Sequence, residues 1–480
     1  MRKSIKRNFF YNAIYQILLL IIPLITTPYL SRVLGADGIG TISYAESMLN
    51  YFVLFANLGI TTYGQREISY VQNKRKQRSI IFWNTKCLQF VTSAIAFVAF
   101  VAFSWQQKNR SLYFALSLQI VAIFFDITWL FQGMEEFGKI VLRNTIVKIL
   151  NIIFVFTFVK SQNDLVLYAI GLTGFVLLGN FSLWGYLSNY IDKIDIKELH
   201  PFREINVVIS LFLPTIAIQV YTVLDKTMIG VITHNSYENG YYEQAFKISR
   251  VALALVTSLG SVMMPRIAFY LDKDFEYVRS TLYKAYRFVW MLSIPLTLGI
   301  VGVAPNLVPW FFGEGYEPVV QLLRILSMLI IAIGVSNITG IQYLIPSKRQ
   351  HLLTVSVCIG AAVNFCMNMI LIPYIQAIGA AIASVCAESI IAVVQLIMVR
   401  KELSIRKIVL SGKNYLLAGL IMLSLLLLES RFLTPSIMHT AIMTVSGAVL
   451  YCAILLLFRD DFFLGNLSLM LGKIRRKTND

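Results

Sequence analysis

Charged residues are scarce in this sequence. Of its 480 residues, 57% are hydrophobic and only 14% are Asp, Glu, Lys or Arg, whereas an ordinary soluble domain has about 25% charged residues. The stretches between the hydrophobic blocks are also short, and the longest of them, 189–204, 265–282 and 459–480, are far below the size of a folded domain. These two absences exclude a soluble enzyme or binding protein and place the activity in or across a membrane.

Motifs of catalysis and nucleotide binding are missing as well. The sequence has no G-x-x-x-x-G-K-[ST] loop, no H-E-x-x-H and no G-x-S-x-G. The four histidines stand singly, and the five cysteines lie inside hydrophobic blocks without a C-x-x-C pair, which favours packing roles over disulfides or a metal site. We therefore expect no enzyme activity, no cofactor, no metal and no direct use of ATP. A proton (H+) or sodium (Na+) gradient, or consumption of the product, is left as the source of energy.

Hydrophobic blocks of about 20 residues, the length of a helix that crosses a bilayer, recur along the whole chain. They predict an all-α polytopic membrane protein with about 14 transmembrane helices, and at least 12. The predicted spans are 9–30, 38–62, 80–103, 110–132, 140–160, 164–188, 205–230, 240–264, 283–304, 318–345, 350–373, 377–399, 414–430 and 436–458.

The net charge of +17 comes from Lys and Arg that gather in alternate loops. The N-terminal MRKSIKR and the stretch GQREISYVQNKRKQRS are examples, while the intervening loops hold few cations. By the positive-inside rule, the basic loops and both termini are cytoplasmic. The same loops suit the anionic headgroups of membrane lipids, so we expect no nucleic acid among the partners.

Two parts of the sequence about 200 residues apart resemble each other. A span interrupted by Pro23 ends in YLSRVLG and leads to GIGTISYAES, and a span interrupted by Pro214 ends in VLDKTMIG and leads to NGYYEQAFK. Parallel repeats are one architecture of secondary transporters, with the substrate path between the halves. We predict two pseudo-symmetric six-helix halves, 1–200 and 201–400, and two additional helices with a basic cytoplasmic tail at 401–480.

Six stretches carry a family resemblance, and the patterns Y-G-x-R-E and D-x-x-W-x-x-Q-G-x-E are the most specific within them. The stretches are GITTYGQREIS at 59–69, DITWLFQGMEEF at 126–137, RNTIVKILNIIFVFTFVKSQNDLVLYAIG at 143–171, VLDKTMIG at 223–230, FFGEGYEPVVQLLRIL at 311–326 and IQYLIPSKRQ at 341–350. Together they resemble the oligosaccharide flippase family of Wzx-type polysaccharide transporters. The larger superfamily also contains multidrug and toxic-compound extruders and lipid II flippases.

The resemblance implies a flippase that works by alternating access in the bacterial plasma (inner) membrane. Its substrate would be a lipid-linked oligosaccharide with an isoprenoid tail and a phosphate or pyrophosphate, used for capsule, O-antigen or a similar surface polysaccharide. A polysaccharide polymerase and the export machinery are the expected partners. Two alternatives stay open: a multidrug or toxic-compound cation antiporter of the same superfamily, for which we expect carboxylates rather than cations in the spans, and a membrane polysaccharide polymerase or ligase, which usually has a larger extracytoplasmic loop.

A phosphate on the substrate needs cations, so Lys and Arg within spans are the first candidates for substrate binding. Arg250 lies near the middle of the eighth predicted span, and Lys247 precedes it by three residues, about on the same helix face. Lys226 in VLDKTMIG and Arg32 in YLSRVLG lie at matching outer ends of the repeat. We predict that these four cations serve the substrate; a structural ion pair for Arg250 and simple anchoring for Lys226 are the alternatives.

Charged residues in the spans could also gate the substrate path or carry a coupling proton. Glu46 has a depth similar to that of Arg250 and could pair with it in one conformation, or with a neighbouring helix instead. Asp126 could form a structural ion pair with Lys86 or Lys148, or titrate. For Lys86 itself, snorkelling to the lipid headgroups is the plainer expectation. The gating or coupling candidates are Glu46, Asp126, Asp225, Arg66, Glu67 and Glu388.

Some of these candidates have specific expected neighbours. Asp225 would partly neutralise Lys226 or bridge to Arg32, as part of an outer gate. Arg66 and Glu67 end the second span, where an ion pair is commonplace, and could instead help to close an inner gate.

Overall fold

The structure is a computed structural model that describes residues 5–258 and 260–468. Every regular element in this described part is a helix, and the predicted all-α fold is thus confirmed. A helix satisfies its backbone N–H and C=O groups internally, which a bilayer without water requires. The chain divides into two compact units, Met1–Gly240 and Tyr241–Asp480. The predicted boundaries at residues 200 and 400 refer to the sequence repeat and stay a prediction.

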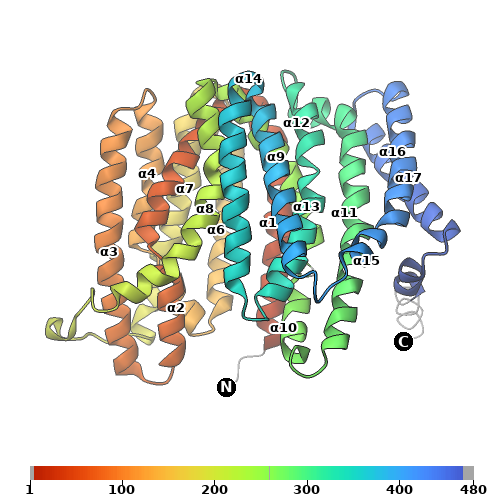
Figure 1. The fold of residues 1–480 in the computed structure, drawn as a ribbon. Helices are drawn as coiled ribbons and strands as arrows, with labels where there is room; N and C mark the ends of the chain where they lie inside the picture. Colours follow the sequence, from red (N-terminus) through yellow and green to blue (C-terminus); the bar gives the residue numbers. More distant parts are fainter. Residues whose placement is uncertain (1–4, 259, 469–480) are drawn as a thin grey trace, which may run out of the picture. The chain divides into compact units, whose positions relative to one another are not determined.

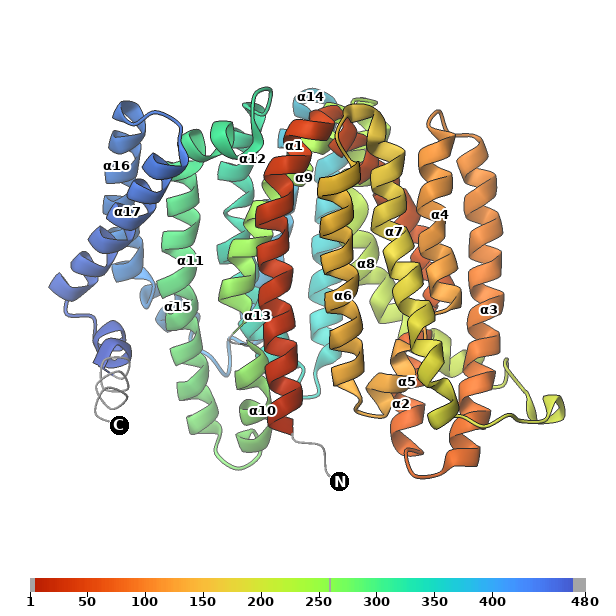
Figure 2. The same cartoon turned by 180° about the vertical axis from the view of Figure 1, so that it is seen from behind.

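In the first unit, long helices alternate with short ones that follow a break (Figure 2). Its elements are α1 (Ile5–Asn57), α2 (Ile60–Tyr70), α3 (Arg75–Trp105), α4 (Arg110–Phe124), α5 (Thr128–Gly133), α6 (Phe137–Phe158), η1 (Gln162–Asp164), α7 (Leu165–Ser182), η2 (Leu183–Asn189), η3 (Ile196–Glu198) and α8 (Ile205–Thr233). The next helix, α9 (Ser236–Thr257), begins in this unit and continues into the second.

The second unit has the same mixture of long and short helices (Figure 1). After α9 follow α10 (Gly260–Tyr270), α11 (Phe275–Phe312), α12 (Pro318–Leu326), α13 (Leu329–Asn337), the π-helix η4 (Ile338–Leu344), α14 (Gln350–Met398), α15 (Ile405–Leu410), α16 (Lys413–Phe432) and α17 (Ile437–Leu457).

The predicted spans coincide with these helices. Nine helical segments among the described residues are long and apolar enough to cross a membrane. One of them, α14, contains two predicted spans, and its backbone leaves the helical conformation between them at Ile375 and Gln376. Helix α1 contains the first predicted span and most of the second, with a break between them at Gly35, whose φ of +67° lies in the left-handed region that glycine adopts without strain. The exact count of fourteen crossings stays a prediction.

The first unit is built around an apolar core that α1, α3, α4 and α7 share. Phe100 of α3 and Leu116 of α4 are fully buried in it. The Thr173 hydroxyl of α7 donates to the Ala115 carbonyl of α4 at 3.1 Å. Figure 1 shows α3, α4 and α7 side by side, and this group of helices holds the polar segments described below.

In the second unit, α16 and α17 pack along α11 (Figure 1). Their shared core includes the buried side chains of Ile294, Met422, Leu426 and Met443. The Tyr451 hydroxyl of α17 donates to the Met291 carbonyl of α11 at 3.0 Å. The two C-terminal helices are therefore docked on this unit rather than standing apart from it.

Gly40 in GIGTISYAES and Gly240 in NGYYEQAFK, which the predicted repeat aligns, each lie against the segment that contains the other. A Cβ atom on Gly40 of α1 would overlap the carbonyl oxygen of Ser236 at the start of α9. A Cβ atom on Gly240 of α9 would overlap the carbonyl oxygen of Ala36 of α1. The contact is thus reciprocal, and it brings two helix backbones together as closely as small residues allow.

Gly40→Ala and Gly240→Ala should each destabilise the protein, because an added methyl group has no space between the two backbones. Overpacking of this kind costs about 1–3 kcal/mol, which would lower the midpoint of thermal unfolding of the purified protein in detergent. Gly174→Ala on α7 is the matched control, since nothing lies within 4 Å of a Cβ atom at that position. Unchanged midpoints for the first two variants would contradict the close approach.

Candidate functional site

The segment VLDKTMIG of α8 lies against α1 within the first unit. The Thr227 hydroxyl donates to Ser47 Oγ at 3.1 Å and accepts from the Tyr51 hydroxyl at 3.1 Å. Gly230 faces the ring of Tyr44, which a Cβ atom on Gly230 would overlap. The glycine and the threonine of this motif therefore serve the contact between α1 and α8.

The predicted outer charges border this contact. Asp225 and Lys226 are half-buried on α8, just before Thr227. Arg32 is exposed on α1, and its Nη1 donates to the Pro28 carbonyl one turn earlier at 3.1 Å. Their roles in substrate binding and in an outer gate stay predictions.

Glu46 is half-buried on α1 and has a cation nearby in the same unit. Lys148, half-buried on α6, is close enough for its charge to interact with that of Glu46. Helices α1 and α6 pack against each other. A neighbouring helix thus supplies a partner for Glu46, while the predicted pair with Arg250 would join the two units and stays a prediction.

Helix α9 carries three charged side chains close together. Lys247 Nζ lies 3.4 Å from Glu243 Oε1, and the Glu243 side chain is only 11% exposed. Arg250 is exposed, with its guanidinium carbon 5.6 Å from the centroid of the Phe246 ring, within cation–π range. Among the described residues, no carboxylate forms an ion pair with Arg250. Arg250 lies about two turns before the end of α9 at Thr257, and its place near the middle of a span stays a prediction.

The face of α9 that carries this group is anchored on α14. The rings of Tyr242 and Phe246 stack with centroids 5.8 Å apart. The Tyr242 hydroxyl and Ser384 Oγ of α14 are 3.2 Å apart and hydrogen-bonded. Glu388 lies one turn beyond Ser384 on α14 and is half-buried. It therefore shares the α14 face that meets α9, and its coupling role stays a prediction.

The motif D-x-x-W-x-x-Q-G-x-E begins at the break between α4 and α5. Asp126 Oδ1 accepts hydrogen bonds from the Thr128 N–H at 2.9 Å and from its hydroxyl at 2.7 Å. Lys86 of α3 is fully buried and donates from Nζ to the Asp126 backbone carbonyl at 3.1 Å and to Gln89 Oε1 at 3.1 Å. The expectation that Lys86 snorkels to the headgroups is wrong. Lys86 is instead buried beside the C-terminal end of α4, where the negative end of the helix dipole favours a cation.

Further carbonyl groups at the same break receive side-chain donors. Gln89 Nε2 donates to the Ile123 carbonyl at 3.0 Å, Asn180 Nδ2 to the Ala122 carbonyl at 2.7 Å and Trp184 Nε1 to the Phe125 carbonyl at 2.8 Å. The last carbonyls of a helix have no partner within the helix, and an unsatisfied one in lipid costs several kcal/mol. The neighbouring helices of the first unit therefore satisfy the carbonyl groups that the break between α4 and α5 leaves without helical partners.

The two most specific patterns of the resemblance pack on each other. A Cβ atom on Gly64 of α2 would come within 2.5 Å of Cε3 of Trp129, which is fully buried on α5. A Cβ atom on Gly133 of α5 would come within 2.7 Å of Cβ of Ile68 on α2. Y-G-x-R-E and D-x-x-W-x-x-Q-G-x-E are thus two sides of one helix contact.

Arg66 and Glu67 form an ion pair at this end of α2, with Arg66 Nη2 2.8 Å from Glu67 Oε1. Glu67 also lines a cavity of about 340 Å³ together with Asn84, His200 and Glu204. The simpler expectation, a helix-end ion pair, describes this geometry. A role in an inner gate stays a prediction.

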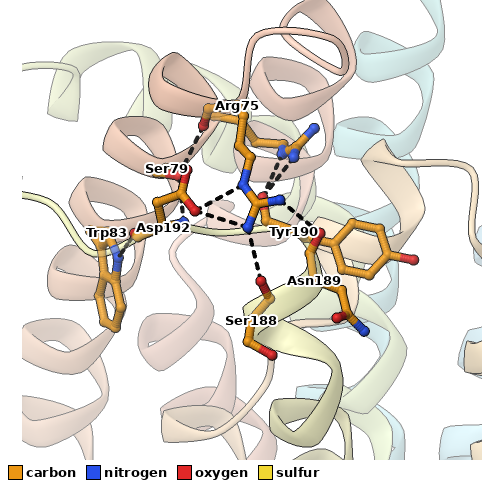
Figure 3. A network of polar contacts seen from close by, with 8 residues as sticks. Arg75, Ser79, Trp83, Ser188, Asn189, Tyr190 and Asp192 are labelled. Atoms are coloured by element: carbon orange, nitrogen blue, oxygen red, sulfur yellow. Dashed lines mark hydrogen bonds and ion pairs between the residues drawn. The ribbon is translucent and has the colours of Figure 1, made fainter.

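A polar network fixes the segment after η2 to the start of α3 (Figure 3). Arg75 Nη2 lies 2.8 Å from Asp192 Oδ1 and donates to the Ser188 carbonyl at 2.9 Å. The Asp192 N–H donates to Ser79 Oγ at 2.9 Å, and Trp83 Nε1 donates to the Asp192 carbonyl at 3.2 Å. One short loop is thus held by three positions of α3.

Tyr190 extends this network to α6. Its backbone carbonyl accepts from Arg78 Nη2 at 2.6 Å, and its hydroxyl accepts from Lys139 Nζ at 2.6 Å and donates to Glu136 Oε1 at 2.7 Å. Burial, together with the hydrogen bond to Glu136, raises the pKa of Tyr190. The segment after η2 therefore ties α3 to α6 at the end of the first unit that we predict to be cytoplasmic.

The second unit has a comparable clamp at the end of IQYLIPSKRQ. Arg349 donates from Nη1 and Nη2 to the two carboxylate oxygens of Glu402, each at 2.8 Å. The Tyr343 hydroxyl also donates to Glu402, and Arg279 Nε donates to its backbone carbonyl at 3.1 Å. Burial raises the pKa of Glu402, but the hydrogen bonds from Arg349 and Tyr343 outweigh burial and hold this pKa below its usual value.

The comparisons with known proteins agree with this architecture. Residues 5–271 match the family model of polysaccharide biosynthesis proteins. The chain belongs to this family. The resemblance to Wzx-type oligosaccharide flippases is thereby confirmed, and the chain is a multi-pass membrane protein.

Two curated relatives cover most of this family member. The "Putative O-antigen transporter" of Escherichia coli (strain K12) is 23% identical over 414 residues, which are 83% of this chain and 97% of the relative. The protein of the same name from Shigella dysenteriae is 24% identical over 381 residues, 77% of this chain and 93% of the relative.

Solved structures share the fold at low identity. The lipid II flippase MurJ in an inward closed conformation has a TM-score of 0.75 at 18% identity, covering 93% of this chain and 98% of that one. An inward-facing multidrug resistance transporter of the MATE family, from the MOP superfamily, has a TM-score of 0.60 at 15% identity, covering 82% and 99%.

The structure adds residues that the sequence patterns did not single out. Glu243, the partner of Lys247, and Glu402, the partner of Arg349, were not assigned a role. Glu243 follows the glycine of NGYYEQAFK by three residues, so only its spacing to Lys247 could have indicated the pair. Among the described residues, no group of three or more His, Cys, Asp or Glu side chains is arranged to hold a metal ion.

Glu402→Gln should destabilise the second unit, because Arg349 then loses its charged acceptor. A hydrogen bond to a charged group contributes about 1.5 kcal/mol or more. Since the pKa of Glu402 is lowered from 4.5 on folding, this contribution is present above pH 4.5 and is lost as the pH falls through the lower folded value. Thermal unfolding of the wild type and the variant between pH 7 and pH 4 measures the difference.

Glu276→Gln is the control for this experiment. Glu276 also pairs with an arginine, Arg279 at 2.9 Å, but its side chain is 77% exposed, and exposed pairs contribute little. The expected order of midpoints at pH 7 is wild type, then Glu276→Gln close to it, then Glu402→Gln. Equal effects of the two variants would contradict a stabilising clamp.

Proposed function

We propose that this protein is a flippase that moves a lipid-linked oligosaccharide from the cytoplasmic to the outer leaflet of the bacterial inner membrane. The substrate would carry an isoprenoid tail and a phosphate or pyrophosphate, and the product would supply a surface polysaccharide such as capsule or O-antigen. The observation that carries this proposal is the exposed Arg250 on α9, with Lys247 one turn away, in a member of the polysaccharide biosynthesis protein family.

The chemistry of the α9 group suits a phosphate. Arg250 presents a planar guanidinium that can hold two phosphate oxygens, and the Phe246 ring beside it restricts its position. Lys247 is held by the nearly buried Glu243. An arriving phosphate would compete with Glu243 for Lys247, so binding and release of the substrate would both have a low barrier.

Alternating access would use the remaining charges as gates. Asp225 and Lys226 would act with Arg32 at the outer end, and Arg66 with Glu67 at the inner end. Both termini would lie in the cytoplasm, and a polymerase would consume the product. We propose a proton or sodium gradient, or this consumption, as the driving force, with Asp126 and Glu388 as candidate coupling carboxylates.

Arg250→Ala should abolish most of the export, whereas Arg250→Lys should retain a substantial part of it. Loss of a hydrogen bond to a charged group corresponds to about a tenfold or larger loss of affinity. The measurement is the surface polymer formed by cells that lack their own flippase, make a defined lipid-linked repeat unit and express each variant at equal level. Arg431→Ala, which removes an exposed cation at the end of α16, should export normally.

Two results would count against different parts of the proposal. Normal export by Arg250→Ala would remove Arg250 from the substrate site. Failure of the wild type to restore polymer with several repeat units, combined with a rise in drug resistance, would favour a multidrug extruder instead.

Glu46 would exchange partners during transport, with Lys148 in one conformation and Arg250 in another. Charge reversal tests each pairing: Glu46→Lys should lower stability and export. Adding Lys148→Glu should recover stability, and the double variant with Arg250→Glu should export more than Arg250→Glu alone, because Glu46→Lys supplies a cation opposite position 250.

The control for these swaps is Glu46→Lys with Lys226→Glu, which keeps the same net charge and should recover neither property. If the swap with Lys148 left the melting midpoint as low as in the single variant, that pairing would be wrong. If the swap with Arg250 exported no more than Arg250→Glu alone, the exchange of partners would be wrong.

A further inference from the structure

A basic pocket lies in the second unit, between α11, the short helix α15, the start of α16 and the segment after α17. Its volume is about 520 Å³, and its charged lining consists of Arg287, Arg406, Lys407, Lys413 and Asp460. None of these residues belongs to the α9 group or to the predicted gates. Four cations and one carboxylate leave the pocket strongly positive.

Asp460, the single carboxylate in the pocket lining, accepts several hydrogen bonds from within the protein. Asp460 is 5% exposed and accepts from Arg287 Nη2 at 3.1 Å, from the Tyr415 hydroxyl at 2.9 Å and from the Phe463 N–H at 3.0 Å. Burial raises the pKa of Asp460, but these hydrogen bonds hold it below its usual value. Asp460 therefore neutralises Arg287 and has no capacity left for the other cations.

The remaining three cations are available to a ligand. Lys407 lies over the Tyr283 ring with Nζ 4.4 Å from the centroid. Arg406 and Lys413 are exposed, and within the described residues neither has a hydrogen-bonded or ion-paired side chain. Three cations around one cavity of this size match an anion with several oxygen atoms, such as a phosphate.

The pocket is fixed in shape by α11. Trp290 Nε1 donates to the Ile408 carbonyl of α15 at 3.0 Å, and the Ser404 N–H donates to the Tyr283 hydroxyl at 2.9 Å. Gly412 packs on the Trp290 ring, where a Cβ atom would come within 3.2 Å. The segment that supplies Arg406 and Lys407 is therefore held in place before any ligand binds.

Large apolar side chains adjoin the cations. Leu410 on α15 is 50% exposed, and on α16 the exposed residues Leu416, Leu417 and Leu420 follow Lys413 within two turns. An exposed apolar face on a helix that crosses the membrane faces lipid tails. Cations and apolar residues thus meet as headgroup and tail meet in a phospholipid.

We propose that this pocket binds the headgroup phosphate of an anionic phospholipid, with the acyl chains lying over Leu410 and the exposed face of α16. Basic pockets between transmembrane helices on the cytoplasmic side select anionic headgroups, and the pocket is on the side that the positive-inside rule makes cytoplasmic. The bound lipid would hold α15, α16 and α17 as one body with α11. This site is separate from the proposed transport route and does not depend on it.

The test is lipid retention by the purified full chain, measured by native mass spectrometry. The protein is released from micelles that contain equal amounts of phosphatidylglycerol and phosphatidylcholine. We expect the wild type to retain phosphatidylglycerol in preference. Arg406→Gln with Lys413→Gln should weaken this retention by about 25-fold, given about a fivefold contribution from each cation.

The matched control is Lys193→Gln with Lys197→Gln, which removes two exposed cations from the first unit. It should leave the preference unchanged. Equal losses in the two double variants would show unspecific attraction to a basic protein and overturn the proposal. An equal thermal midpoint of both variants in zwitterionic detergent ensures that a loss of binding does not reflect unfolding.

Two competing ligands distinguish a bound phospholipid from free phosphate and from an isoprenoid phosphate. Inorganic phosphate at a tenfold excess should not displace phosphatidylglycerol, because it lacks the chains that cover Leu410. An isoprenoid phosphate at equal amount should displace less than half of it. Complete displacement by the isoprenoid phosphate would overturn the assignment and make the pocket a docking site for the transported lipid.

Discussion

The first unit depends on how the carbonyl groups at the break between α4 and α5 are satisfied. Four side chains from two neighbouring regions of the chain, Lys86, Gln89, Asn180 and Trp184, donate to them. A bilayer offers no water for these groups, so the break exists only because α3, α7 and η2 pack beside it. The position of the D-x-x-W motif, and through it the contact between α5 and α2, follows from this requirement.

The same rule accounts for other polar side chains within the hydrophobic helices. Arg324 Nε donates to the Val301 carbonyl at 3.1 Å, Asn306 Nδ2 donates to the Leu433 carbonyl at 2.7 Å, and the Thr92 hydroxyl donates to the Ala56 carbonyl at 2.7 Å. These groups stabilise the scaffold. Arg250 differs from them, because it contacts an aromatic ring rather than a carbonyl or a carboxylate among the described residues. This difference is the physical ground for the proposal that Arg250 binds the substrate.

Sequence alone predicted the fold class, whereas most contacts of the candidate site residues could not be read from it. Hydrophobic length determines where helices lie, so the spans coincide with helical residues. Breaks are harder to predict, because the one after Phe124 depends on side-chain donors from α3, α7 and η2. The same limit applies to Lys86, which stands near a span end like a snorkelling cation but is buried by the packing of α3 on α4. Partners such as Lys148 for Glu46 join helices about 100 residues apart, and no local pattern indicates them.

Helix α1 packs on the start of α9 through the reciprocal contact of Gly40 and Gly240. During synthesis, the first unit can therefore reach its final packing only after about 240 residues have entered the membrane. A chain that stops after the sixth predicted span, near residue 200, would leave Gly40 and Ser47 of α1 without their contacts on α9 and α8. The first unit therefore includes segments on both sides of residue 200, and its packing depends on α8 and the start of α9.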